Sequence, residues 1–174
     1  MMNEKTETIV PHVNFRVREL GDWVDKNTDD YFKDKKVIVF SLPGAFTPTC
    51  SNQQLPGFEK QADVFKAHGI DEIYCMSVND SFVMNAWFEQ QGITKVKPLP
   101  DGNGDFAKSI NMLNDFTNRG FGMRSWRYCM YVKDSHIHTR YAEWGEPEAC
   151  PIQDPFDVSS AEKMIESLKS IKAN

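Results

Sequence analysis

The sequence predicts an α/β protein with a mixed central sheet flanked by helices. This prediction rests on two near-continuous apolar runs, each followed by a helical pattern, and on a later pair of strands separated by a short turn. A closing amphipathic helix completes the order of elements. The chain has 174 residues, of which 40% are hydrophobic, so we expect one domain spanning 1–174 with a core of ordinary size.

The strands are predicted from periodicity and from apolar runs. Residues 13–17 alternate between polar and apolar types, as a short strand does. Residues 37–42 are apolar almost throughout, which is typical of a strand buried on both faces. Residues 73–78 form a second core strand, and the ranges 127–133 and 137–141 form two more around a turn.

Three helices follow from spacing and from capping residues. In the first, Pro56 is expected to bend or restart the helix, which stops near Gly69 and has one apolar face formed by Phe58, Ala62 and Phe65. The second follows the capping residues 79–81 and carries Phe82, Ala86 and Trp87. The third opens with a capping box, residues 159–162, and has a core stripe of Met164, Ile165, Leu168 and Ile171.

Composition excludes several classes of function. The formal net charge of −5 gives no electrostatic reason to expect nucleic-acid binding. No run of about 18 apolar residues exists, and the polar, acidic start is unlike a signal peptide, so we expect a cytoplasmic protein that does not enter a membrane. The cysteines lack a Cys-x-x-Cys pair, and His136 with His138 is too few ligands for zinc. No metal or cofactor is expected.

The most informative segment surrounds Cys50. Thr47 is a natural N-cap, and Pro48 fits the first position of a helix, where its missing N–H costs nothing. Cys50 then lies in the first turn, near unpaired amides and the positive end of the helix dipole. A thiolate is stabilised there, which predicts a nucleophile, whereas a lone cysteine after a strand is otherwise a small buried core residue.

Four segments, in order along the chain, resemble peroxiredoxins. Residues 39–51, VFSLPGAFTPTCS, continue into LPGF at 55–58 and are similar to the active-site segment of the type II, peroxiredoxin-five-like subgroup. The segments CMSVNDSFVM (75–84), GMRSWRY (122–128) and DVSSAE (157–162) also resemble that subgroup. The resemblance implies a thioredoxin-like fold, a thiol peroxidase that needs no metal or haem, and commonly a homodimer.

By this resemblance, Cys50 is the peroxidatic cysteine, Thr47 supplies the hydroxyl that contacts it, and Pro43 with Gly44 lies at the substrate. A thiolate is needed for in-line attack on an O–O bond, and a threonine hydroxyl can donate to one peroxide oxygen while it accepts the peroxide proton. The substrate is then hydrogen peroxide or a small alkyl hydroperoxide, and the product is a sulfenic acid on Cys50.

The resemblance also assigns Arg127 as the guanidinium that meets the thiolate. From spacing alone Arg127 is a surface strand residue, and Arg124 competes for the role. A guanidinium favours both the thiolate and the charge that develops on the leaving oxygen. The alternative to an enzyme is a non-catalytic redox sensor on the same scaffold, which would oxidise at Cys50 and signal through a partner.

The resetting step has several candidates, because a sulfenic acid must be resolved by a second thiol. Cys75 falls where plant type II relatives hold a second cysteine, yet it lies in an apolar strand and can equally be a core thiol. Cys150 lies between two prolines in an insert-like segment that we expect to be an exposed loop. Cys129 is expected to be a core residue that serves only packing. The resemblance suggests glutathione and glutaredoxin as the reductant, with thioredoxin as the alternative.

Overall fold

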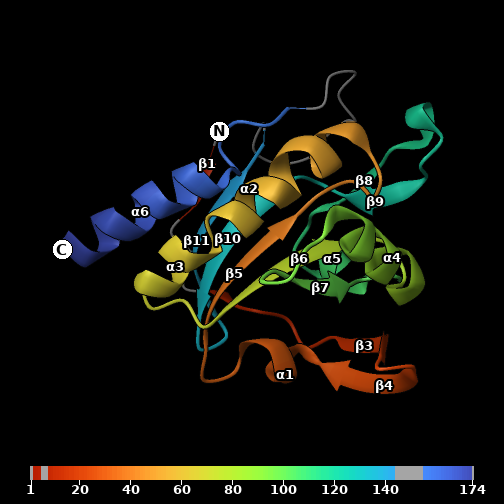
Figure 1. Ribbon diagram of the computed structural model, residues 1–174, viewed down its shortest axis with the longest axis horizontal. Helices are drawn as coiled ribbons and strands as arrows, with labels where there is room; N and C mark the ends of the chain where they lie inside the picture. The colour runs from red at the N-terminus through yellow and green to blue at the C-terminus, as the bar shows by residue number, and fades with distance from the viewer. Residues whose placement is uncertain (1, 5–7, 144–154, 174) are drawn as a thin grey trace.

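The computed structural model describes residues 2–4, 8–143 and 155–173, and its centre is a mixed sheet of seven strands (Figure 1). The strands of this sheet run in the order β1, β11, β10, β5, β6, β7, and β2 pairs with β11. Their bounds are β1 Met2–Glu4, β2 Thr8–Ile9, β5 Lys36–Ser41, β6 Glu72–Ser77, β7 Lys97–Pro100, β10 Tyr128–Lys133 and β11 His136–Ala142. The predicted α/β class with a mixed sheet is confirmed.

Two hairpins and the helices surround this sheet. The hairpins pair β3 Asn14–Glu19 with β4 Asp22–Asn27, and β8 Leu113–Asp115 with β9 Met123–Ser125. The helices are α1 Thr28–Phe32, η1 Cys50–Gln54, α2 Leu55–Lys60, α3 Ala62–Ala67, α4 Ser81–Gln91, α5 Asp105–Ser109, η2 Thr117–Arg119 and α6 Ala161–Ala173. Within the described ranges, none of these helices combines the length and the apolar character needed to cross a membrane.

Strand β5 is the centre of the sheet and explains its mixed character. It pairs in parallel with β6 and antiparallel with β10, so that Phe40 lies between Cys75 and Cys129. Its side chains alternate between two hydrophobic clusters: Ile38 and Phe40 point to one, and Val37 and Val39 point to the other. A strand that is buried on both faces requires the continuous apolar run that predicts it.

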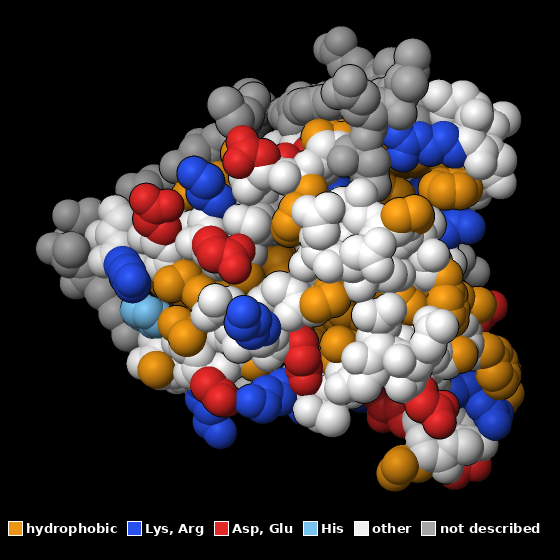
Figure 2. Space-filling model, turned by 45° about the horizontal axis from the view of Figure 1, so that its top comes forward, with side chains coloured by type: hydrophobic (Ala, Val, Ile, Leu, Met, Phe, Trp, Pro, Cys, Tyr) orange, Lys and Arg blue, Asp and Glu red, His pale blue; other side chains and the backbone are white. Residues whose placement is uncertain are grey.

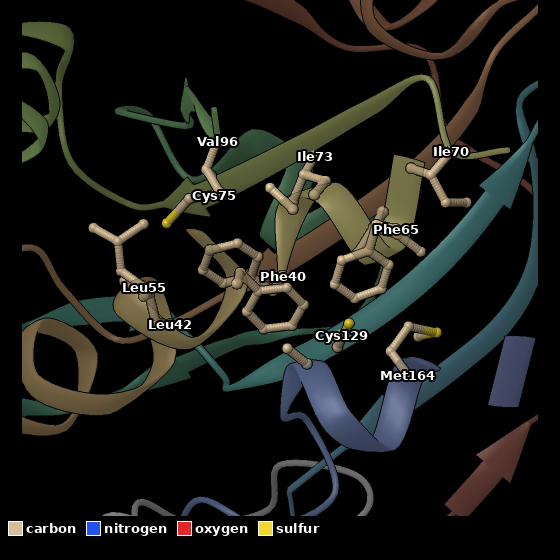
Figure 3. Packing of buried hydrophobic residues seen from close by; sticks show 14 of the residues in the cluster. Phe40, Leu42, Leu55, Phe65, Ile70, Ile73, Cys75, Val96, Cys129 and Met164 are labelled. Atoms are coloured by element: carbon tan, nitrogen blue, oxygen red, sulfur yellow. The ribbon is translucent and has the colours of Figure 1, made fainter. Parts of the chain in front are cut away.

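The first cluster lies under α2, α3, α4 and α6, and it contains the helix face predicted from the sequence. Phe58, Ala62 and Phe65 are all buried in it, and Figure 3 shows Phe65 among its neighbours in this cluster. The rings of Phe40 and Phe58 stack with centroids 4.0 Å apart, and Phe65 stacks on Phe58 at 5.8 Å. This packing anchors the helix that follows Cys50 directly onto the central strand.

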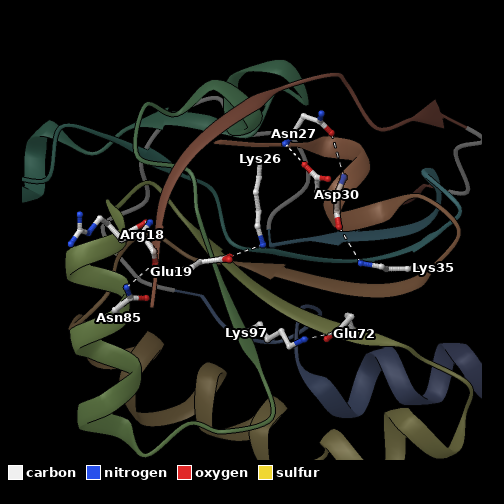
Figure 4. Close-up of polar contacts among 10 residues, drawn as sticks. Arg18, Glu19, Lys26, Asn27, Asp30, Lys35, Glu72, Asn85 and Lys97 are labelled. Atoms are coloured by element: carbon white, nitrogen blue, oxygen red, sulfur yellow. Dashed lines mark hydrogen bonds and ion pairs between the residues drawn. The ribbon is translucent and has the colours of Figure 1, made fainter. Parts of the chain in front are cut away.

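The second cluster lies on the opposite face, under the β3–β4 hairpin, α1 and α5. A polar contact ties this hairpin to α4, where the Asn85 amide donates to the carbonyl of Arg18 at 3.4 Å, while Lys26 pairs with Glu19 at 2.6 Å within the hairpin (Figure 4). Asn27 forms a capping box with Asp30 at the start of α1. Only the first strand of this hairpin was predictable, because β4 is charged and largely exposed.

The cap of α6 is one residue later than predicted. The capping box expected at residues 159–162 is wrong, because the hydroxyl of Ser160 accepts from the Lys163 amide at 3.3 Å. The preceding Ser159 is buried, and its N–H and hydroxyl both donate to the carboxylate of Glu143. The local sequence assigns Ser159 to the helix cap, but in the folded protein Ser159 binds Glu143 instead.

A buried carboxylate makes the stability of this fold depend on pH. Asp101 is 2% exposed, and burial raises its pKa to about 6, although the amides of Phe106 and Ala107 donate to it. Since the folded state takes up this proton before the unfolded chain does, the contribution of Asp101 to the free energy of unfolding rises as pH falls from 7 to 4.

We expect the stability of wild type relative to Asp101→Asn to rise by at most about 3 kcal/mol over that interval. Urea unfolding of both proteins at several pH values measures this difference in the free energy of unfolding. The other carboxylates are present in both proteins, so their contributions cancel. A difference that stays constant, or that falls with acidification, would contradict the pKa assigned to Asp101.

Candidate active site

The segment from β5 into η1 places Cys50 in the first turn of a helix, as the sequence predicts. Residues 48 and 49 are already helical, and the Ser51 amide donates to the Thr47 carbonyl at 2.9 Å. η1 is a π-helix, in which the Leu55 amide donates to the carbonyl of Cys50. The change to an α-helix comes just before Pro56, which has no N–H to continue the earlier pattern. The predicted restart at Pro56 is confirmed.

Thr47 bounds this helix on its N-terminal side and closes the loop before it. Its carbonyl accepts the first helical hydrogen bond, while its hydroxyl donates to the Gly44 carbonyl at 2.7 Å. A hydroxyl that donates once still has lone pairs with which to accept. Pro43 and Gly44 are buried, and a Cβ on Gly44 would lie only 2.7 Å from Nη1 of Arg124, so a larger residue here would displace the end of that arginine side chain.

Arg127 is the arginine that meets the sulfur. It directly precedes β10, is 2% exposed, and its Nη1 lies 3.5 Å from Sγ of Cys50, which is itself 0% exposed. Arg124 instead donates to the carbonyls of Pro43, at 3.3 Å, and Phe121, at 3.1 Å. The two candidate arginines thus have separate positions, one at the thiol and one on the loop that surrounds it.

Gln54 belongs to the same site and was not singled out from the sequence. Its side chain is fully buried, and Oε1 accepts from Nη1 of Arg127 at 2.5 Å. Nε2 donates to the carbonyl of Ser159 at 3.5 Å. The available signal was its place four residues after Cys50, which puts both side chains on one side of a helix.

A second loop contact fixes the other side of the site. Asn79, two residues after β6, accepts from the Ala45 amide at 3.0 Å and from the Ser77 hydroxyl at 2.6 Å. The neighbouring Ser51 accepts from Nε1 of Trp87 at 2.9 Å. Segments that follow β5, β6 and the β8–β9 hairpin therefore converge around Cys50.

The other cysteines differ from Cys50 in their surroundings. Burial raises the pKa of Cys75 well above its ordinary value, the charge of Cys50 raises it further, and Arg127 lowers it. Burial also raises the pKa of Cys129. Both side chains are fully buried and reduced, and Figure 3 shows them on core strands. Cys150, the other candidate for resolution, lies outside the described residues.

Among the described residues, we find no second candidate site formed by charged side chains or by potential metal ligands. On the face seen in Figure 2, acidic and basic side chains are interspersed and do not gather by sign. Among the residues that the structure describes, no three His, Cys, Asp or Glu side chains come together where they could hold a metal ion. The described groups beside Sγ of Cys50 are the Arg127 guanidinium and the backbone of the helix that Cys50 opens.

Comparison with known proteins agrees with this geometry. The redoxin family profile matches residues 9–165. A peroxiredoxin of Synechocystis is 47% identical, with 94% of this chain and 91% of that protein covered, and a hybrid peroxiredoxin, hyPrx5, of Haemophilus influenzae is 48% identical, with 91% and 64% covered. The structure of reduced Prx3 with H2O2 from Vibrio vulnificus has a TM-score of 0.86 at 35% identity, with 97% and 98% covered. The chain belongs to the redoxin family and, within it, to the thioredoxin-fold peroxiredoxins of type II, the peroxiredoxin-five-like group.

Proposed function

We propose that this peroxiredoxin reduces hydrogen peroxide and small alkyl hydroperoxides at Cys50. The observation that carries the proposal is the contact between Arg127 and Cys50, 3.5 Å from Nη1 to Sγ, at the start of a helix and away from water. The similar Prx3 of Vibrio vulnificus was solved with H2O2, which supports the choice of substrate. A fully buried sulfur favours a small peroxide over a bulky one.

The reaction is an in-line displacement on the peroxide. The Cys50 thiolate attacks one oxygen, so that an S–O bond forms as the O–O bond breaks. Sulfur loses two electrons and becomes a sulfenic acid, and the leaving hydroxide or alkoxide takes a proton and departs as water or alcohol. Arg127 stabilises the thiolate before attack and the leaving oxygen during it, and because Arg127 is buried, water screens its charge little.

The loop around Cys50 supplies the orientation. With its hydrogen directed to Gly44, the Thr47 hydroxyl is placed to accept the proton of the peroxide. Pro43, whose carbonyl accepts from Arg124, and Gly44 form the buried wall beside the thiol. These contacts hold the attacking sulfur and the substrate in one geometry and reduce the entropic cost of the step.

For the resetting step we propose an external thiol, glutathione with glutaredoxin, and thioredoxin as the alternative. Burial keeps Cys75 protonated, so it is a poor attacking thiol in the described conformation. Because Cys50 is also fully buried, the η1 segment has to open before any reductant reaches its sulfur. The π-helical hydrogen bonds of that segment are the first that opening would break.

Thiol mapping by mass spectrometry separates these routes. After one equivalent of peroxide, followed by glutathione, we expect a sulfenic acid on Cys50 and then a mixed disulfide between Cys50 and glutathione. A disulfide from Cys50 to Cys150 or Cys75 would contradict the external route and indicate a two-cysteine cycle. Oxidation of Cys50 with negligible recycling by glutaredoxin and by thioredoxin would favour the redox sensor.

We further propose that the chain is a cytoplasmic homodimer. Free thiols at Cys50, Cys75 and Cys129 suit a reducing compartment. Exposed apolar side chains near the site, Phe46 at 49% and Phe82 at 57%, are surfaces that a second copy could cover. Light scattering across micromolar concentrations should give the mass of two chains, and a monomer mass throughout would reject the dimer.

A further inference from the structure

Glu143 is a buried carboxylate that the chemistry at Cys50 does not use directly. It directly follows β11 and is 2% exposed. Buried acidic side chains are uncommon unless several donors compensate for the lost water. The donors to the Glu143 carboxylate therefore identify the segment that this side chain holds in place.

The carboxylate binds the turn that precedes α6. Oε1 accepts from the amides of Asp157, at 2.9 Å, and Val158, at 3.2 Å. Oε2 accepts from the Ser159 amide at 3.0 Å and from the Ser159 hydroxyl at 2.7 Å. Four donors on two oxygens fix the turn at three successive residues, and only an acceptor on both atoms can satisfy all of them.

The main chain of Glu143 binds the other side of the site. Its N–H donates to the carbonyl of Arg127 at 3.0 Å, and its own carbonyl accepts from Nε1 of Trp126. Glu143 therefore connects the residues that open β10 with the turn before α6. Both connected segments contact the guanidinium, since Phe156 in that turn also lies under it, 6.0 Å from Cζ to the ring centroid.

The turn continues into the Cys50 site through a chain of hydrogen bonds. The Ser159 carbonyl accepts from Nε2 of Gln54, and Oε1 of Gln54 accepts from the same Nη1 of Arg127 that donates to Cys50. We propose that Glu143 is a positioning residue for Cys50, which acts through Ser159 and Gln54 to hold the Arg127 guanidinium against the sulfur. This inference rests on the proposed role of Arg127 at the thiol.

Glu143→Gln is the informative variant, because it keeps the shape of the side chain but replaces one acceptor oxygen with a donor. Two of the four donors then face an N–H2 group, whichever way the amide is turned. We expect the rate constant of Cys50 with hydrogen peroxide to fall about 10- to 100-fold. Alkylation of Cys50 by iodoacetamide at pH 7 should slow as well, and Glu143→Asp, which keeps the carboxylate, should restore part of both rates.

Glu59 offers a matched control elsewhere in the chain. Its carboxylate accepts from the amides of Thr94, Lys95 and Val96 and from the Thr94 hydroxyl. Glu143 likewise binds three successive amides and one hydroxyl. Glu59→Gln should lower the melting temperature but leave the peroxide rate constant within about twofold of wild type. If both variants slow Cys50 equally, the effect is one of general stability and the positioning role is wrong.

A double-mutant cycle tests the route through Gln54. If Glu143 acts through Gln54, the variant with both Gln54→Ala and Glu143→Gln should react no more slowly than Gln54→Ala alone. Effects that multiply would overturn the route. Alkylation of Cys50 needs no peroxide, so a wild type that alkylates normally but leaves peroxide intact would refute the proposed function while the cycle still reports on Glu143.

Should Glu143→Gln not fold, two neighbouring serines provide the comparison. Ser159→Ala removes one donor to Glu143, whereas Ser160→Ala removes the cap of α6 and none of the donors to that carboxylate. We expect slower peroxide reaction and slower alkylation in the first variant only. Equal rates in the two variants would overturn the role of Glu143.

Discussion

Cys50→Ser should abolish NADPH-coupled consumption of hydrogen peroxide with every reductant. A serine hydroxyl remains protonated at neutral pH and cannot form a sulfenic acid, so the variant keeps the loop and the helix but has no nucleophile. Cys50 is fully buried in the first hydrophobic cluster, and because the substitution is nearly isosteric the fold should persist. The measurement is the rate of peroxide loss above the uncatalysed background.

Cys129→Ala is the matched control for this prediction. Cys129 is as buried as Cys50 but lies on core strand β10, where burial raises its pKa. It should retain most of the wild-type turnover, at a modest cost in stability from the cavity left by sulfur. Near-native turnover by Cys50→Ser, or equal loss in both variants, would show that the reaction does not take place at Cys50.

Arg127→Gln should lower the rate constant for peroxide about 10²- to 10³-fold while the variant still forms a sulfenic acid on Cys50. The amide retains a donor near the sulfur but has no charge to stabilise the thiolate or the leaving oxygen. Arg127→Lys keeps the charge but loses the rigid planar guanidinium that holds Nη1 against both Cys50 and Gln54, so we expect an intermediate rate. Stopped-flow measurement with excess peroxide gives the three rate constants.

Arg140→Gln controls for loss of an arginine in the neighbouring strand. Arg140 lies in β11 and donates to the carbonyl of Ile110 at 3.2 Å. Its variant should react with peroxide within about twofold of wild type. A rate for Arg127→Gln that matches this control would remove Arg127 from the chemistry.

The sequence was sufficient for elements in which local pattern and tertiary structure agree. The apolar run that became β5 is buried on both faces, and the face of Phe58 and Phe65 packs where its period predicts. The same holds for the helix start near Cys50, because Pro48 suits the first turn of a helix, although the Thr47 hydroxyl donates to Gly44 and is not seen to cap the helix. These features depend on residues close in sequence, so a single chain reveals them.

The remaining features depend on partners that are distant in sequence. Ser159 binds Glu143 instead of capping α6, and Gln54 is explained only by Arg127, 73 residues later. Strand β4 is charged and exposed, and the hairpin that it forms with β3 is visible only when its cross-strand partners are known. No local pattern distinguishes such residues from ordinary polar positions.

The central claim is that Arg127 and the helix amides around the buried sulfur of Cys50 stabilise its thiolate. The most direct test is the rate constant for alkylation of Cys50 by iodoacetamide at pH 7, in wild type and in Arg127→Gln. We predict that wild type reacts at least about 10-fold faster than the variant, because the guanidinium favours the reactive thiolate. Equal rate constants in the two proteins would contradict the account.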